Sequence, residues 1–115
     1  MNDDIKELQA MLLKQHQALF DAVEATSDPA VANALLIEMQ EILHRITVTQ
    51  QLLLNETSVK LTAAVEKVDN ANQDLSAALA DIQKVADVVN SITKFLTLVD
   101  KAIDLAKTLG AAAAI

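Results

Sequence analysis

The sequence predicts an all-α fold in which a helical hairpin is followed by one long, heptad-patterned helix, together forming a three-helix coiled-coil bundle. The 115 residues include one Gly and one Pro, so residues that favour turns are scarce. Apolar residues make up 52% of the chain and aromatic residues only 2%, so Ala, Leu, Val and Ile must supply the burial. Their recurrence in steps of three and four residues is typical of amphipathic helices. We therefore expect a single all-helical domain over residues 1–115.

The first helix is expected over about 3–25. Asn2 or Asp3 can cap its N-terminus, where acidic side chains also complement the helix dipole. Leu13 and Phe20 lie beside its apolar stripe and widen it. The residues of the stripe itself follow helical spacing and should face the core: Ile5, Leu8, Met11, Leu12, Leu19, Ala22 and Val23.

A short turn should follow at Thr26–Pro29. Ser27 or Asp28 can cap the second helix, and Pro29 suits its first turn, where a missing N–H costs nothing. Because this connection is short, the first two helices should form an antiparallel hairpin.

The second helix is expected over about 29–54. Leu36, Leu43 and Leu52 form a second apolar flank, so this helix needs neighbours on more than one side. Its main stripe follows the three-four spacing: Leu35, Met39, Ile42, Ile46, Thr49 and Leu53.

Residues 55–58 leave two alternatives open. Asn55 to Ser58 are cap-forming residues, and Thr57 or Ser58 can cap a third helix. All four are nevertheless tolerated inside helices, and neither Gly nor Pro is present. The second and third helices are therefore either separate or joined in a continuous rod of roughly 120 Å.

The third helix is expected over about 58–109, and its heptad pattern organises the chain. Its first half has small seam residues at Ala64, Ala71 and Ala78, which favour a narrow contact with one helix. Its second half is apolar over a broad face, which needs several partner helices or a lipid surface. Gly110 should end this helix, leaving a frayed tail over 110–115.

These patterns predict a non-enzymatic interaction or assembly protein that acts through helix surfaces. The partner is expected to be another copy of the chain or a helical protein. The alternative is a membrane- or lipid-active protein, such as a pore-forming component or a lipid or granule coat, that uses the apolar face of residues 85–109. The residues expected at the interface follow the heptad of the third helix: Leu61, Val68, Leu75, Ile82, Val89, Ile92, Phe95, Leu96, Val99 and Ile103.

No residue is predicted to have a catalytic, cofactor-binding or metal-binding role. The chain has no Cys, and its serines lack a nucleophile elbow. Glu41 and His44 form one Glu-x-x-His step, but di-iron bundles need two such steps and two further Glu residues. A solvated histidine is the better interpretation. Gln15 stands where the stripe of the first helix expects an apolar residue, and His16 lies at the border of that stripe. Both are expected to hydrogen-bond across a helix seam, with a pH-sensing role as the alternative.

Charge and hydropathy restrict the partners and the location. The formal net charge of −7 disfavours nucleic acid and anionic lipid. Met1 to Asp4 lack the features of a signal peptide, and charged residues interrupt the most apolar window, 85–109, so no transmembrane helix is expected. A cytoplasmic location is the expectation, with leaderless export left open.

Overall fold

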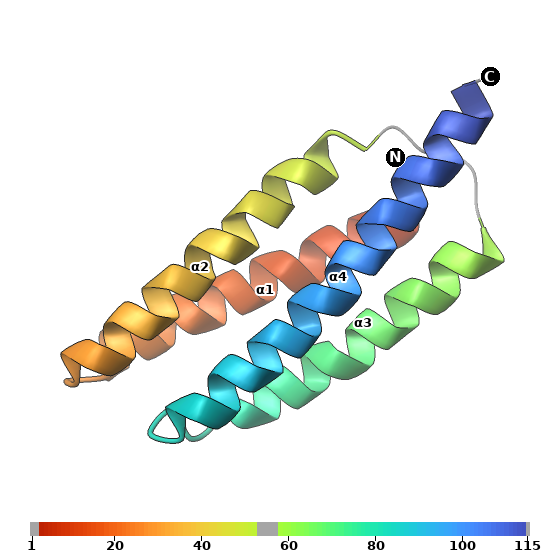
Figure 1. The fold of residues 1–115 in the computed structure, drawn as a ribbon. Helices are drawn as coiled ribbons and strands as arrows, with labels where there is room; N and C mark the ends of the chain where they lie inside the picture. The colour runs from red at the N-terminus through yellow and green to blue at the C-terminus, as the bar shows by residue number, and fades with distance from the viewer. Residues whose placement is uncertain (1–2, 53–57, 115) are drawn as a thin grey trace.

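The computed structural model describes residues 3–52 and 58–114, and this part of the chain is an all-helical bundle (Figure 1). Its helices are α1 (Asp3–Ala25), α2 (Pro29–Gln50), α3 (Val59–Ala78) and α4 (Val85–Ala114). No strand occurs within the described ranges. The bundle is elongated, with extents of 52 × 21 × 17 Å.

The four helices form two stacked hairpins. α1 pairs with α2 and α3 pairs with α4, while the hairpins meet through the contacts of α1 with α3 and of α2 with α4. Figure 1 shows that α1 and α3 run in the same direction and that α2 and α4 run in the opposite one. Consequently α2 and α3 lie at diagonally opposite corners, although they are consecutive in the sequence.

The turn of the first hairpin follows the predicted capping chemistry. Asp28 is the N-cap of α2, and its carboxylate accepts a 2.9 Å hydrogen bond from the backbone N–H of Ala30. Pro29 occupies the first turn of α2, where it needs no backbone donor. Of the two candidate caps, Asp28 is therefore the one that acts. The three residues between the helices return the chain at once, so α1 and α2 are antiparallel.

The predicted apolar stripes of α1 and α2 form one side of the core. The face of α1 is buried at Ile5, Leu8, Met11, Leu12, Leu19 and Ala22. The face of α2 is buried at Leu35, Met39, Ile42, Ile46 and Thr49. Burial of such stripes supplies most of the stability of a helix inside a protein, which explains why the three-four spacing locates them.

The expectation of one helix over 58–109, and with it the three-helix count, is wrong. The chain leaves α3 after Ala78, turns over residues 79–84 and enters α4 at Val85. Tight hydrogen bonds close this turn, from Asp81 N–H to Ala78 O and from Lys84 N–H to Asp81 O, both at 3.2 Å. The segment contains neither Gly nor Pro, so local propensity does not cause the break. Folding back instead buries the broad apolar face of α4 against α3 and α2.

The alternative of a continuous helix from α2 into α3 is also wrong. α2 ends at Gln50, Ser58 caps α3 by accepting a hydrogen bond from Leu61 N–H, and the two helices run in opposite directions (Figure 1). The expected end of the second helix at residues 53–54 and the cap-forming residues 55–57 lie outside the described residues.

The C-terminal helix extends further than expected. α4 continues through Gly110 to Ala114, so Gly110 does not end it and the frayed tail expected over 110–115 is helical up to that point. Among the described residues no Gly has a positive φ angle, the conformation that a C-terminal glycine cap requires. The alanines that follow have the highest helix propensity and outweigh one glycine. Ile115 lies outside the described residues.

Candidate functional site

The residues predicted at an interface lie mostly in the core of this single chain. Ile82 and Val89 are half-buried. The others are buried and pack into the hydrophobic core shared with the chain's own helices: Leu61, Val68, Leu75, Ile92, Phe95, Leu96, Val99 and Ile103. The broad face of α4, which the lipid-active alternative would use, is occupied in the same way by contacts with α2 and α3. Exposing it requires α4 to leave the bundle.

Large exposed apolar side chains concentrate instead on the first hairpin. Leu13 and Phe20 on α1 are 55% and 43% exposed, and Leu36 and Leu43 on α2 are 42% and 51% exposed. We call these four residues the outer stripe. They lie beside the predicted core stripes. Their seven-residue spacing is the feature of the sequence that marks them as separate rows on α1 and α2.

The outer stripe includes two residues on each helix of the hairpin. Leu13 and Phe20 are seven residues apart, as are Leu36 and Leu43, so each pair repeats after about 10.5 Å along its helix. Because α1 and α2 are antiparallel and joined by residues 26–28, positions at similar distances from this turn lie at similar levels. Leu13 therefore lies near the level of Leu43 and Phe20 near the level of Leu36. The four side chains therefore present apolar area at two levels of one hairpin, the arrangement of a helix-packing surface.

Most positions around the outer stripe are uncharged, but carboxylates lie at its Phe20 end: Glu24 is four residues from Phe20, and Asp21 accepts a 3.0 Å hydrogen bond from Gln17. On α1 the polar, uncharged positions three or four residues from Leu13 or Phe20 are Gln9, His16 and Gln17. On α2 the corresponding positions around Leu36 and Leu43 are Asn33, Gln40 and Thr47. The low density of charge around most of the stripe lets another acidic surface approach closely, although the chain has a net charge of −7.

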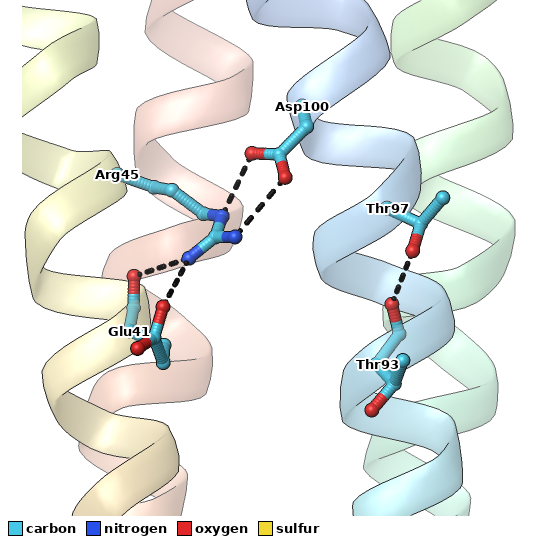
Figure 2. A network of polar contacts seen from close by, with 5 residues as sticks. All are labelled: Glu41, Arg45, Thr93, Thr97 and Asp100. Atoms are coloured by element: carbon cyan, nitrogen blue, oxygen red, sulfur yellow. Dashed lines mark hydrogen bonds and ion pairs between the residues drawn. The ribbon is translucent and has the colours of Figure 1, made fainter.

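A charged network joins the two hairpins at α2 and α4. Figure 2 shows Arg45 of α2 between Glu41 and Asp100. Its Nε and Nη2 donate to the two carboxylate oxygens of Asp100 at 2.8 and 3.0 Å, and its Nη1 donates to Glu41. These bonds, chiefly those to Asp100, raise the pKa of Arg45. The bidentate geometry fixes the register between the hairpins. The sequence pattern did not predict this pairing, because Arg45 and Asp100 lie on different helices.

A second polar cluster joins α1 to α3. Gln15 is fully buried, and its Nε2 lies 3.2 Å from the backbone oxygen of Asn72 and 3.0 Å from Oγ of Ser76. The side-chain oxygen of Asn72 also accepts from this amide. The predicted hydrogen bonding of Gln15 across a helix seam is therefore confirmed. His16 is half-buried and has no hydrogen bond to another described residue.

The Glu41–His44 step does not form a paired site in this structure. The carboxylate of Glu41 accepts from Arg45 at 3.0 Å, while His44 is exposed. The described residues contain no group of three or more His, Cys, Asp or Glu side chains placed to hold a metal ion. The polar clusters of this bundle therefore connect helices.

The fold and its surfaces define a class, an all-α bundle of two stacked hairpins with an exposed apolar stripe. No family model, curated protein or solved structure matches the chain. Within the described ranges, no helix combines the length and the apolar character needed to cross a membrane.

Proposed function

We propose that this chain is a non-enzymatic helical assembly protein that associates with a second copy of itself through the outer stripe. The observation that carries the proposal is the exposure of Leu13, Phe20, Leu36 and Leu43 at matching levels of one hairpin. Exposed apolar area of this kind marks interfaces. The heptad-patterned residues expected at the interface serve the core, so the assembly surface lies on α1 and α2.

A second copy fits this surface because the stripe is neutral and repeats on both helices. Two such faces can meet by the packing of their Leu and Phe side chains, and the surrounding Gln, Asn and Thr side chains can hydrogen-bond between copies. A contact centred on these uncharged side chains reduces the repulsion that two chains of net charge −7 would otherwise experience. The two hairpins then differ in role, since one associates and the other completes the core.

The test is the mass in solution, measured by light scattering after size exclusion over a dilution series. Wild type should exceed the chain mass of 12.4 kDa at high concentration and approach it on dilution. The double variant Leu13→Gln/Leu43→Gln should stay at the monomer mass throughout. Both positions are exposed and Gln is a good helix former, so its circular dichroism melt should match wild type.

Val59→Gln is the matched control. Val59 is 89% exposed, but it lies on α3, outside the outer stripe, so its removal should leave the self-association unchanged. Wild type that is monomeric at every concentration would contradict self-assembly. An oligomer that resists the Leu13→Gln/Leu43→Gln change would place the interface elsewhere.

A further inference from the structure

The second hairpin has a surface of different chemistry, a shallow groove between α3 and α4. Its volume is about 350 Å³, and its described lining comes from these two helices alone. Ala64, Leu98 and Leu105 supply apolar lining, and Lys60, Lys67 and Lys101 contribute three positive charges. The small side chain of Ala64 leaves room that a larger residue would fill.

The lysines of the groove form no ion pair with a carboxylate in residues 3–52 and 58–114. Both ion pairs found in the described part of the chain belong to Arg45, so Lys60, Lys67 and Lys101 form none there. Three like charges gathered at one groove repel each other, and this chain is otherwise acidic. The groove therefore favours an occupant that carries negative charge and an apolar face.

The spacing of the charges favours a helix as that occupant. Lys60 and Lys67 are one heptad apart on α3. Lys101 is one heptad after Lys94 on α4, so these two lie on one side of that helix. Charges that repeat every seven residues beside an apolar seam occupy the positions that pair with acidic residues of a neighbouring helix in coiled coils. A fatty acid carries its single charge at one end, so it would pair with only some of these lysines.

We propose that the groove between α3 and α4 binds an acidic amphipathic helix of a partner protein. The partner helix places its apolar stripe on Ala64, Leu98 and Leu105, and its Asp or Glu side chains on both flanks pair with the lysines. This mode is the docking of a helix in a groove, with charge complementarity selecting the partner. The groove lies on the opposite hairpin from the outer stripe, so this interaction goes beyond self-assembly and does not depend on it.

The probe is a fluorescent peptide of about 21 residues, three heptads with Leu at a and d and Glu at e and g. Repulsion between its glutamates keeps the peptide monomeric. Fluorescence anisotropy should show saturable binding to wild type that weakens from about 0.05 M to about 0.5 M salt. The triple variant Lys60→Glu/Lys67→Glu/Lys101→Glu should bind about tenfold more weakly or worse, because three attractive contacts become repulsive.

The matched control reverses three lysines outside the groove, Lys6→Glu/Lys14→Glu/Lys84→Glu. It makes the same change in net charge and should retain the affinity of wild type within about twofold. A second peptide with Lys in place of each Glu should bind the groove variant better than it binds wild type, which shows that the variant is folded and that the charges act locally.

Three results would overturn the proposal. One is the absence of binding between wild type and the Glu peptide. Another is an equal loss of affinity in the groove variant and the control variant, since net charge alone would then explain it. The third is complete displacement of the peptide by monomeric dodecanoate at comparable concentration, which would assign the groove to an anionic amphiphile.

Discussion

At the scale of single residues, the buried amide of Gln15 illustrates how polar groups specify the packing of this bundle. Gln15 lies in the seam between α1 and α3 and is hydrogen-bonded to Asn72 and Ser76. A buried amide group that loses its partners has a large desolvation cost, so the register that gives Nε2 of Gln15 its acceptors is favoured. Oε1 of Gln15 is buried without a hydrogen-bond partner among the described residues. The cluster stabilises a particular arrangement more than it adds to the total stability.

Replacement of Asn72 should reveal that dependence. Asn72→Leu should lower the free energy of unfolding by about 1–3 kcal/mol, because the amide of Gln15 loses its side-chain acceptor in the core. The double variant Gln15→Leu/Asn72→Leu should recover most of this loss, since an apolar pair of similar size leaves fewer unpaired polar groups. Urea denaturation measures both values. Asn70→Leu, at an exposed position on the same helix, is the control, and an equal effect there would contradict the argument.

Glu38 gives the bundle a pH dependence of known sign. Partial burial, and secondarily the charge of Glu41, raise the pKa of Glu38 above its ordinary value of 4.5, while Arg45 opposes the shift. The folded chain therefore binds this proton more tightly than the unfolded chain does. It follows that the contribution of Glu38 to stability falls as the pH rises from about 4.5 through the raised pKa.

Glu38→Gln should therefore stabilise the protein at pH 7 and have less effect below pH 4.5. Thermal melts of both proteins across this range measure the difference. Glu24→Gln is a suitable control, because Glu24 is an exposed residue of α1. A gain in stability for Glu38→Gln that grows as the pH falls would contradict the direction of the shift.

At the scale of the elements, α4 shows how a broad apolar face determines where a helix must lie. Val88, Ile92, Phe95 and Val99 are fully buried, because α4 packs against both α3 and α2. A helix with apolar residues over so much of its surface cannot remain an extension of α3, where half of that face would meet water. The turn at 79–84 is thus a consequence of packing.

Substitutions on α4 should distinguish its buried side from its exposed side. Ile92→Asp and Leu96→Asp should each destabilise the fold by several kcal/mol, because each places an unpaired charge in the core. Lys94→Ala, on the exposed side, should be nearly neutral. Circular dichroism melts compare the three variants, and three melts equal to wild type would mean that the helix faces the other way.

At the scale of the whole molecule, the stacking of the hairpins gives each of them one inner and one outer face. The inner faces meet through α1 with α3 and α2 with α4, held by the core, Gln15 and Arg45. The outer faces differ in chemistry: that of the first hairpin carries the exposed apolar stripe, and that of the second has a groove lined by lysines. A bundle of this design can present two surfaces to two kinds of helix, which is why we propose an assembly role.

The sequence alone determined the helical class, the boundaries of α1, the two candidate caps Ser27 and Asp28, and the core stripes of the first hairpin. These features depend on local spacing and capping, which operate within a few residues of the chain. The end of α2 at Gln50 and the length of α4 were less predictable, because the residues there tolerate both helix and turn.

Only the tertiary structure decided the number of helices, the diagonal placement of α2 and α3 and the identity of the exposed stripe. Heptad spacing showed that Leu61 and Phe95 needed partners, but it did not distinguish a partner in the same chain from one in another. That distinction depends on whether the chain can fold back at 79–84 and bury more apolar area than a straight helix would. Burial of area between distant segments outweighs weak local preferences, and this balance is set by the whole fold.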